Sequence, residues 1–548
     1  MSPPADLKLA IPPSLGYTLK APTCLPPTPP SSTSSLPTSE LEPEVAVSAS
    51  RNMLESFPEY ETTASFDRLR ATEYSYLDEN NHVYLDYTGA GLAAKAQYQA
   101  HQARLSADLF SNPHSANPTS EASTKLVEQA RADVLRFLNA SPDTYTVIIT
   151  TNATGAARLI GESYPFGRNS TFLLTADNHN SVNGIREYAR RRHARTVYVP
   201  LQTPSLRVDP GALASVLAPP TTWPWTRRSS DTNRPKKRRG LFAYPAQSNF
   251  SGVRHPLEWV TTAQKAGYDV LLDAAAYLPT NRLDLSPGNP QPDFILMSWY
   301  KVFGFPTGLG CLVARKDALA RLSRPWFAGG TVQAVLTGVQ WHSLTTTEGA
   351  FEDGTVNFLA IPEISVGLKW IQALGVENIR TRVHCLTGYC LAGLQALRHR
   401  DGSPMVKIYG PAPDPNRPGV DPGGDRGGTI AFNFLDQTGK IVDERIVARE
   451  SAAAGISLRT GCFCNPGAAE HAFGITKPLL RGLRRRFRDT LTVEAYIQLL
   501  GLPSGGAVRV SFGLVSNVAD VERFLGWAAR TYRDRVTGTE GLVARTEC

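Results

Sequence analysis

Short apolar runs alternate with helical patterns between about residue 66 and residue 330. The runs are continuous rather than alternating in polarity, which is typical of strands buried on both faces of a sheet. The predicted strands are 146–151, 171–175, 197–199, 241–244, 269–273 and 294–297. Strands that alternate with helices indicate a mainly parallel α/β sheet with crossover helices. In such sheets ligands bind at the carboxyl ends of the strands.

One helix between these strands has a clear apolar face. Ser120 is predicted to be its N-cap, and Leu126, Ala130, Val134 and Phe137 lie at spacings that put them on the same side. We therefore expect this helix to pack against the sheet.

The chain of 548 residues is longer than one compact core usually holds. A helical segment near Ile361 leads into a second region, whose predicted strands are 429–434, 456–459 and 507–512. The predicted organisation is a disordered tail at 1–50, a large α/β domain at 51–360, a small α+β domain at 361–535 and a tail at 536–548.

The N-terminal fifty residues are dense in Pro, Ser and Thr and poor in aromatic residues. Such a composition cannot bury enough apolar surface to offset the entropy of ordering the chain. No apolar stretch reaches the roughly 18 to 20 residues that cross a bilayer. The N-terminus also lacks the charged and apolar regions of a secretory signal, and its scarcity of arginine argues against a mitochondrial transit peptide. We expect a cytoplasmic protein.

The net charge of +8 is concentrated in one segment. Residues 227–239 carry seven basic side chains against Asp231, a local charge of +6. They belong to an insertion, 222–240, which we interpret as a solvated surface loop, with a nuclear localisation or polyanion-binding patch as the alternative. The charge is too local to indicate a protein that binds nucleic acid as a whole.

Two polar residues follow neighbouring predicted strands: Asp273 closes one apolar run and Lys301 comes after the next. This arrangement is what a pyridoxal phosphate (PLP) enzyme requires. The lysine amine forms the Schiff base with the cofactor aldehyde, and the carboxylate pairs with the protonated pyridine nitrogen. Taken alone, Asp273 could cap a helix and Lys301 could be an exposed loop residue. A buried carboxylate costs several kcal/mol unless it is paired, and a pyridinium supplies the partner.

Other residues with a possible cofactor role lie at further strand ends. Ala153 and Thr154 stand at a strand-to-helix junction, where free NH groups favour a phosphate, although Thr-Gly at a helix start is also a simple cap. His179 is either a surface or capping residue or a ring that stacks on the pyridine and shuttles protons. Asn249 is either a turn residue or a donor to the cofactor's phenolic oxygen.

The seven cysteines are an odd number in a long chain, which argues against a disulfide framework. Cys462 and Cys464 share a Gly-rich loop with the spacing Cys-x-Cys. A zinc site would need two further soft ligands, which the nearby sequence lacks. Structural thiols are an alternative, and a nucleophilic cysteine near Arg459 is the favoured interpretation. Arg509 could clamp a substrate carboxylate or be an ordinary strand arginine.

Residues from about 80 to 530 resemble the class V aminotransferase fold group and, within it, the cysteine desulfurases. Several strings are more specifically similar to the N-terminal domain of eukaryotic molybdenum cofactor sulfurases. These strings are Tyr84-Leu-Asp-Tyr-Thr-Gly-Ala-Gly, Asp177-Asn-His-Asn-Ser-Val, Trp326-Phe-Ala-Gly-Gly-Thr-Val, Phe351-Glu-Asp-Gly-Thr and Arg459-Thr-Gly-Cys-Phe-Cys-Asn-Pro-Gly. The last string is the most specific.

The resemblance implies the type I fold of PLP-dependent transferases, with a large domain on a mainly parallel sheet and a smaller C-terminal domain. It also implies a role for each matching residue. The cofactor site would consist of Lys301 for the Schiff base, Asp273 for the pyridine nitrogen, His179 for stacking, Asn249 for the phenolic oxygen, and Ala153, Thr154 and Ser298 for the phosphate.

The remaining roles concern the substrate and a second subunit. Arg509 matches the arginine that binds the substrate carboxylate, and Cys464 matches the thiol that receives sulfur, ahead of Cys462. Thr331 would reach the cofactor phosphate of a second subunit, since such enzymes are typically homodimers. The chain departs from many desulfurases at Ala276, where they have a cofactor-contacting glutamine, and at Tyr300, where they have a histidine.

The sequence thus predicts a PLP-dependent cysteine desulfurase that converts L-cysteine to alanine and leaves a persulfide on Cys464. The sulfur would pass in trans to molybdenum cofactor or to a carrier protein, without a metal site, a membrane or nucleic acid taking part. Two alternatives stay open: a PLP-dependent lyase, aldolase or aminotransferase that forms no persulfide, and a non-catalytic scaffold.

Overall fold

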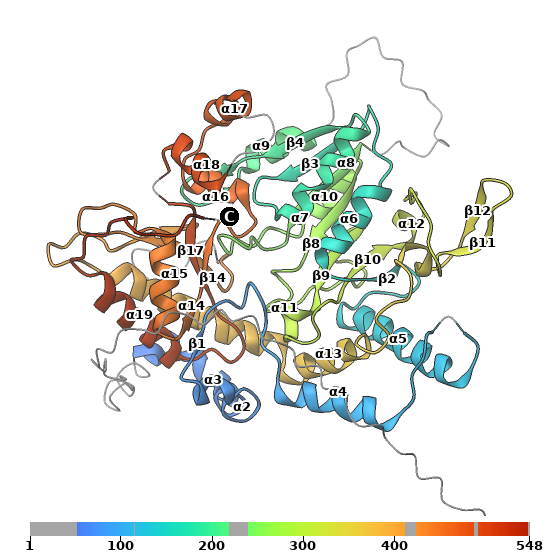
Figure 1. Cartoon of the computed structure of the whole chain (residues 1–548), viewed down its shortest axis with the longest axis horizontal. Helices are drawn as coiled ribbons and strands as arrows, with labels where there is room; N and C mark the ends of the chain where they lie inside the picture. Colours follow the sequence, from blue (N-terminus) through green and yellow to red (C-terminus); the bar gives the residue numbers. More distant parts are fainter. Residues whose placement is uncertain are drawn as a thin grey trace, which may run out of the picture. The chain divides into compact units, whose positions relative to one another are not determined.

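A seven-stranded sheet forms the centre of the region between residues 145 and 315 (Figure 1). β10 is antiparallel to both of its neighbours, while the other strands run in one common direction. The order across the sheet is β2 (Tyr145–Thr150), β10 (Gly310–Arg315), β9 (Phe294–Ser298), β8 (Tyr268–Asp273), β7 (Gly240–Pro245), β3 (Thr171–Thr175) and β4 (Arg195–Val199).

This computed structural model describes residues 52–113, 115–218, 239–411, 424–486, 492–502 and 504–545. The predicted tail 1–50 and nearly all of the insertion 222–240 lie outside the described residues. Gly240 was predicted to end that insertion, but it is the first residue of β7. The boundary predicted at 360/361 stays a prediction. In the described part of the chain, no helix is long and apolar enough to cross a membrane.

The predicted strands of the large sheet are confirmed, and with them the α/β fold class. Their continuous apolar character has the expected cause, because successive residues face two different apolar layers. In β9, Ile295 and Met297 contact one layer, whereas Phe294 and Leu296 contact the other. Each strand is therefore buried on both sides, as a sheet covered by crossover helices requires.

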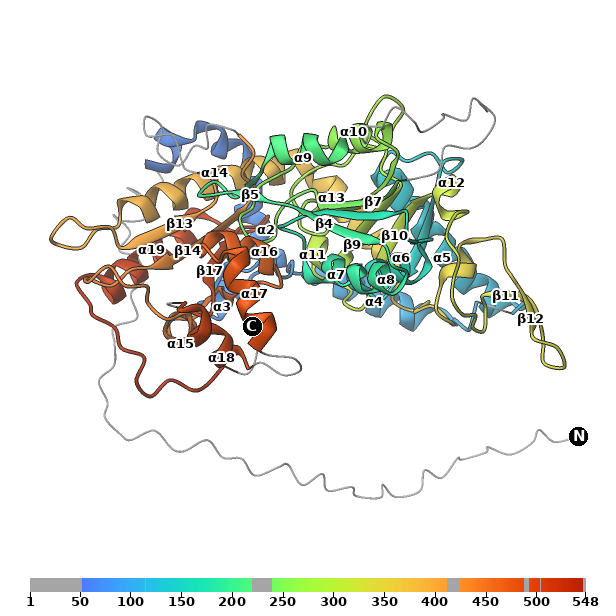
Figure 2. The ribbon, with the colours of Figure 1, turned by 90° about the horizontal axis from the view of Figure 1, so that it is seen from above.

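Helices cover the two faces of this sheet in two sets (Figure 2). Crossover connections between parallel strands place helices on both sides, and each set buries its own apolar layer. One set is α5 (Pro118–Phe137), α9 (Pro210–Leu217), α10 (Trp259–Lys265) and α13 (Pro362–Leu374). The other set is α6 (Ala153–Ser163), α7 (Asn180–Asn183), α8 (Ile185–Arg191) and α12 (Lys316–Leu319).

The helix predicted to begin at Ser120 is α5, but its N-cap was predicted wrongly. The N-cap is Asn117, whose side-chain oxygen accepts a hydrogen bond from the Ser120 N–H, and Pro118 occupies the first helical position. Proline fits there because the first-turn N–H has no helical partner, so the Asn-Pro pair starts the helix three residues earlier. The predicted apolar face is confirmed at Ala130, Val134 and Phe137, which are buried, but Leu126 is only partly buried and Val127 is buried in its place.

A second sheet of four antiparallel strands lies in the C-terminal region, where strands were predicted at 429–434, 456–459 and 507–512; its strand at 406–409 was not predicted. Its order is β13 (Val406–Tyr409), β14 (Thr429–Phe434), β17 (Ala507–Ser511) and β16 (Arg459–Gly461). The strand predicted at 456–459 is in fact divided at Leu458, because the chain changes partners there. β15 (Ile456–Ser457) pairs in parallel with β1 (Val83–Tyr84), whereas β16 pairs with β17.

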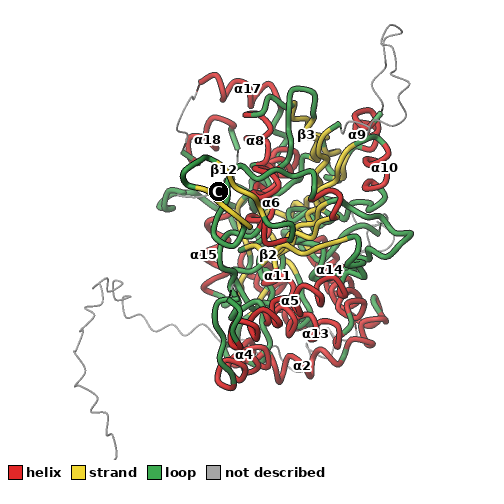
Figure 3. Tube along the Cα trace, turned by 90° about the vertical axis from the view of Figure 1, so that its right-hand side faces the viewer, coloured by secondary structure: helices red, strands yellow, loops and turns green. Residues whose placement is uncertain are grey.

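The remaining elements surround the two sheets (Figure 3). Two short hairpins are β5 (Leu201–Gln202) with β6 (Arg207–Val208), and β11 (Val332–Leu336) with β12 (Trp341–Leu344). The other helices are η1 (Pro58–Thr63), α2 (Ser65–Glu73), α3 (Tyr76–Glu79), α4 (Lys95–Ala107), α11 (Trp299–Phe303), η2 (Glu348–Phe351), α14 (Val376–Ala396), α15 (Glu444–Ala453), α16 (Pro466–Ala472), α17 (Lys477–Arg486), α18 (Val493–Leu500) and α19 (Val518–Tyr532).

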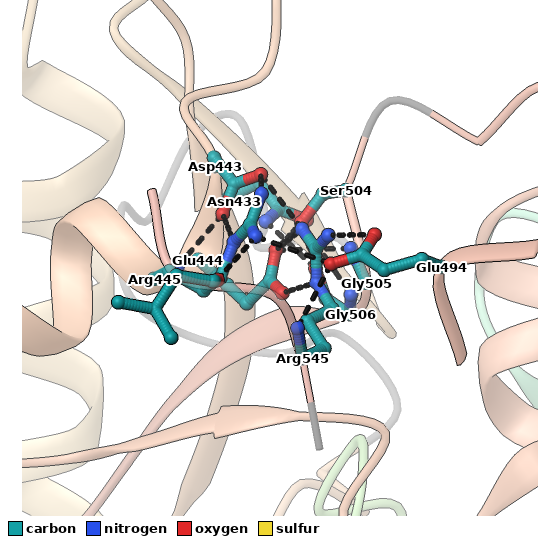
Figure 4. Close-up of polar contacts among 10 residues, drawn as sticks. Asn433, Asp443, Glu444, Arg445, Glu494, Ser504, Gly505, Gly506 and Arg545 are labelled. Atoms are coloured by element: carbon teal, nitrogen blue, oxygen red, sulfur yellow. Dashed lines mark hydrogen bonds and ion pairs between the residues drawn. The ribbon is translucent and has the colours of Figure 1, made fainter. Parts of the chain in front are cut away.

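A buried ion cluster ties the C-terminal segment to this second region (Figure 4). The Arg545 guanidinium contacts Asp443 at 2.7 Å, Glu444 at 2.6 Å and Glu494 at 2.9 Å. Glu444 also accepts the Gly505 N–H at 2.9 Å and the Ser504 hydroxyl. Arg545 thereby joins carboxylates of α15 and α18, and Arg445 shares two of them by contacting Asp443 at 2.9 Å and Glu494 at 3.2 Å.

The cluster also fixes the base of the cysteine loop, residues 461–465. The Gly506 carbonyl, next to Gly505, accepts the Asn433 amide at 3.1 Å. Gly506 packs directly on Gly461, because a Cβ added to Gly506 would lie 2.2 Å from the Gly461 carbonyl carbon. Only glycine permits this close approach of two backbones.

Replacing Arg545 by methionine should lower the free energy of unfolding by about 3 kcal/mol, because it leaves the buried Glu444 carboxylate without its ion-pair partner, whereas Asp443 and Glu494 keep their contacts with Arg445. Chemical denaturation monitored by fluorescence measures this change. Arg400→Met is the matched control, since the Arg400 side chain is 87% exposed and pairs with Asp534 at the surface. That control should lose less than about 1 kcal/mol. Equal losses in the two variants would contradict the structural role of the cluster.

Candidate functional site

A polar cavity of about 120 Å³ opens at the carboxyl ends of the parallel strands of the large sheet. The segments that follow β2, β3, β7, β8 and β9 each contribute to its wall. Its lining residues are Asn152, Ala153, Thr154, His179, Ser181, Pro245, Gln247, Asn249, Asp273, Ala275, Ala276, Leu296, Ser298, Tyr300 and Lys301. The structure thus brings together seven of the sequence-predicted site residues at the edge where α/β sheets bind ligands.

Lys301 and Asp273 share this cavity from neighbouring strands. Asp273 ends β8, and its Oδ1 accepts a hydrogen bond from the Ala275 N–H at 3.0 Å. Lys301 lies on α11, the short helix that follows β9. Burial lowers the pKa of the Lys301 amine from its ordinary value of 10.5, while the Asp273 charge opposes that shift. A larger fraction of the amine is therefore neutral, and so nucleophilic, than in a solvated lysine.

His179 follows β3, is the N-cap residue of α7 and lines the cavity. Its Nδ1 accepts the Ser181 N–H at 3.1 Å and lies 2.9 Å from the Ser181 hydroxyl. The neutral ring therefore carries its proton on Nε2. Burial lowers the pKa of His179 below 6.5, and the charges of Lys301 and Arg509 act in the same direction while Asp273 opposes them. The ring is thus neutral at physiological pH.

An anion cradle is formed where α6 begins. Asn152 caps this helix by accepting the Gly155 N–H at 2.9 Å, and the Ala153 N–H donates to the Ser298 hydroxyl at 2.8 Å. The Thr154 hydroxyl lies 2.7 Å from the hydroxyl of Ser181. First-turn N–H groups and hydroxyls around a helix N-terminus are the donors that hold a phosphate. Ala153, Thr154 and Ser298 thus lie together as the phosphate interpretation requires.

The cysteine loop lies against the segment that carries His179. The Asn180 N–H donates to the carbonyl of Cys464 at 2.7 Å. A Cβ on Gly467 would lie 2.0 Å from the Ala176 carbonyl oxygen, so the start of α16 touches the same segment. Cys464 is exposed, whereas Cys462 is buried. Only Cys464 therefore offers its thiol beside the cavity without a rearrangement of the loop.

Two asparagines lock this loop in place. Asn249 donates its side-chain amide to the Phe463 carbonyl at 2.7 Å and accepts the Asn465 amide at 2.9 Å. Asn465 also donates to the carbonyl of Asp177 at 2.7 Å. Asn249 also lines the cavity. Its side-chain amide bonds to the cysteine loop, and its predicted role as a donor to the cofactor's phenolic oxygen stays a prediction. The loop and the cavity wall are therefore one connected unit.

Arg509 is buried on β17 and shares a carboxylate with Arg459. Its Nη2 lies 2.7 Å from one oxygen of Asp86, and Arg459 Nη2 lies 2.8 Å from the other oxygen. Arg509 also donates to the Asn249 carbonyl at 2.9 Å and lies over the Phe463 ring. Burial lowers the pKa of Arg509, and Asp86 opposes that shift. Two guanidinium groups around one carboxylate leave a net positive charge beside the cavity.

Thr331 is the predicted site residue that the structure does not bring to the cavity of this chain. It is buried in a turn before β11, where its hydroxyl donates to the Ala328 carbonyl and accepts the Ala328 N–H, both at 2.8 Å. Its prediction involved a second subunit, and that role stays a prediction.

Three residues with a clear place in the site were missed by sequence reasoning. Gln247 lines the cavity, donates to the Ala276 carbonyl at 3.0 Å and has a buried Oε1 without a partner among the described residues. Asp86 joins the two arginines, and Asn465 locks the loop. Asp86 and Asn465 belong to strings that were already singled out, and Gln247 lies two residues before Asn249, so these positions were the available signal.

Residues 83–223 and 230–524 match the aminotransferase class-V family. The chain is 34% identical over 480 residues to the molybdenum cofactor sulfurase of Homo sapiens, covering 84% of this chain and 51% of that protein. It is also 34% identical over 492 residues to that of Solanum lycopersicum, covering 85% and 57%. The chain spans about half the length of these curated relatives.

The fold is similar to that of a cysteine desulfurase from Thermococcus onnurineus NA1. The TM-score is 0.66 with 21% identity, and the alignment covers 85% of this chain and 97% of the other. The family match extends over both sheets, the cavity and the cysteine loop. The chain therefore belongs to the aminotransferase class-V family.

Proposed function

We propose that this protein is a PLP-dependent cysteine desulfurase. The observation that carries the proposal is the convergence of Lys301, Asp273 and His179 in one cavity, with the exposed Cys464 thiol held beside it by Asn180. An amine, a carboxylate and an accessible thiol are the three groups that this reaction needs from the protein.

The residues of the cavity fit PLP. Among the described residues, nothing hydrogen-bonds Oδ2 of Asp273, so this oxygen could receive a pyridinium proton. Lys301 would hold the aldehyde carbon, and the start of α6 with Thr154 and Ser298 would hold the phosphate. The neutral His179 ring would lie on the pyridine face. The unpartnered Gln247 Oε1 provides a further polar contact in the same wall.

PLP supplies an electron sink that stabilises negative charge at the α-carbon of a bound amino acid. The chain's own residues do the rest. Burial lowers the pKa of the Lys301 amine, which can accept a proton at Nζ. The Asp273 charge acts to raise that pKa and so favours the protonated form once the proton has moved.

L-cysteine is the substrate that the site suits best. Arg509 and Arg459 would orient its carboxylate, since the two guanidinium groups carry more charge than Asp86 neutralises. The exposed Cys464 thiolate would then attack the substrate sulfur. The carbon–sulfur bond of the substrate breaks, a sulfur–sulfur bond forms on Cys464, and alanine remains.

The similarity to molybdenum cofactor sulfurases favours molybdenum cofactor as the final sulfur acceptor, reached directly or through a carrier protein in trans. We also propose a homodimer. The β11–β12 hairpin exposes the apolar side chains Val335, Leu336 and Trp341, an arrangement typical of a surface covered by another subunit. Thr331 lies in the turn directly before this hairpin. In the proposed dimer, this turn would contact the cofactor phosphate of the second subunit.

Incubation with L-cysteine should add the mass of one sulfur atom to the wild-type chain, located on a peptide that contains Cys464. Cys464→Ala should abolish the gain, and Cys462→Ala should retain most of it, because Cys462 is buried. Intact-protein and peptide mass spectrometry measure both. A gain that persists in Cys464→Ala would contradict the assignment. Turnover without any gain would favour a PLP enzyme that forms no persulfide.

The rate of PLP uptake by the cofactor-free protein should rise with pH through a midpoint below 10.5, because burial lowers the Lys301 pKa. Asp273→Asn should move the midpoint lower still, since the Asp273 charge raises that pKa. Stopped-flow absorbance of the cofactor measures the rate. A midpoint that does not fall in the variant would contradict the coupling of the two groups.

Arg509→Lys should raise the KM for L-cysteine about tenfold or more, because lysine cannot make the bidentate contact. Steady-state alanine formation measures the effect. Arg459→Lys is the matched control on the facing strand; because the Arg459 side chain is 49% exposed, we expect a smaller increase. Thermal unfolding of both variants separates a loss of substrate binding from a loss of the Asp86 contacts.

A further inference from the structure

A group of exposed arginines lies next to the cysteine loop. α7 contains Asn180, which bonds the Cys464 carbonyl, and α8 begins two residues after α7 ends. We call the exposed arginines on α8 and directly after it the arginine face. Its members are Arg186, Arg190, Arg191, Arg192 and Arg195.

The arginine face continues across the cysteine loop. α16 follows the loop directly, and the charge of Arg186 acts on Glu470 of α16, whose pKa burial raises. α17 comes next in the chain and exposes Lys477 and Arg481. In both Figure 1 and Figure 3, α8 and α17 lie at the same end of the molecule. Exposed basic side chains thus lie on α8, which follows the helix that contacts the cysteine loop, and on α17, which follows that loop and α16 in the chain.

Neighbouring acids neutralise little of this charge. Glu187 contacts Arg190 at 2.6 Å and Arg186 at 3.6 Å, and it is the exposed acid of α8. Within the part of the chain that the structure describes, no ion pair involves Arg191, Arg192 or Arg195. Basic residues in the last turn of a helix interact favourably with the helix dipole. This interaction accounts for Arg190 and Arg191. Of the other three, Arg186 donates to the Tyr198 hydroxyl at 3.1 Å, whereas Arg192 and Arg195 make no side-chain hydrogen bond or ion pair within the described residues.

We propose that the arginine face, with Lys477 and Arg481, is the docking surface for an acidic protein that receives sulfur from Cys464. This inference rests on the proposed desulfurase function. The helical part, residues 186–191, extends over about 9 Å at 1.5 Å per residue, which exceeds the size of one small anion. Opposite charges on a partner would steer it toward the thiol and fix its orientation.

An acidic protein fits this surface better than single-stranded nucleic acid. Nucleic-acid sites of that kind combine basic residues with aromatic side chains on which bases stack. The arginine face and the described part of α17 expose no Phe, Tyr or Trp side chain, Tyr188 of α8 is partly buried, and the exposed ring of the segment is His193. Transfer itself needs no oxidant: the acceptor thiolate attacks the outer persulfide sulfur, the old sulfur–sulfur bond breaks, and the Cys464 thiolate leaves.

The first test measures the electrostatic potential at Cys464 without any turnover. Iodoacetate is anionic and iodoacetamide is neutral, so the ratio of their alkylation rates at Cys464 reports the local charge. Arg190→Glu/Arg191→Glu should lower this ratio about threefold or more at low ionic strength, and added salt should remove the difference. Arg68→Glu/Arg282→Glu, with the same charge change on exposed residues elsewhere, should leave it unchanged.

An unchanged ratio in the Arg190/Arg191 variant, or an equal fall in the control, would overturn the proposal. The readout does not depend on L-cysteine, so it remains valid if the desulfurase function fails. Conversely, the sulfur mass gain on Cys464 should be the same in the wild type and in the Arg190/Arg191 variant, because these arginines lie outside the cavity.

The second test uses a fluorescent polyglutamate peptide and a fluorescent single-stranded RNA as probes. Polyglutamate should bind the wild type in fluorescence anisotropy, and the Arg190→Glu/Arg191→Glu variant should bind it about tenfold more weakly. The Arg68/Arg282 control should retain wild-type binding. Failure of polyglutamate to bind would overturn the proposal. Tighter binding of RNA than of polyglutamate at this face would also overturn it, in favour of a nucleic-acid site.

Discussion

The sharing of Asp86 between two arginines is the constraint on which the site depends. Asp86 follows β1, whereas Arg459 and Arg509 face one another across β16 and β17. Two guanidinium groups this close would repel each other, and the carboxylate between them removes that repulsion. The contact joins three segments that lie far apart in the sequence. It holds β16, and therefore the cysteine loop that follows β16, at the edge of the large sheet.

The cysteine loop keeps a strained backbone because its surroundings determine it. Phe463 and Cys464 both have positive φ, 56° and 54°, which costs about 1 to 2 kcal/mol for each non-glycine residue. Hydrogen bonds from Asn249 and Asn180 to the carbonyls of these two residues oppose that strain. The Phe463 side chain is buried under Arg509, which leaves the neighbouring Cys464 thiol directed outward. Strain stored in this way positions a reactive group without making the loop mobile.

Strands of the large sheet could be predicted because burial on both faces leaves a continuous apolar run in the sequence. Contacts between distant segments leave no such pattern. Asn117 competes with Ser120 for the same helix start, and only the proline after Asn117 indicates the correct choice. The cavity residues were predictable where each follows a strand, but Gln247 and Asp86 acquire their roles only from partners brought together by the fold. Spacing along one strand cannot reveal a partner on another sheet.

Burial affects the charges of the ionisable side chains in and beside the cavity in different ways. Desolvation favours the neutral forms of Lys301 and His179, whose pKa values are lowered. Arg509 is equally desolvated, but a guanidinium remains charged and is paired with Asp86 at 2.7 Å. The cavity therefore combines an amine and a ring whose neutral forms are favoured with a positive charge beside them. In the proposed reaction the amine would take a proton and the cation would hold a carboxylate, so one environment would supply both the base and the anchor.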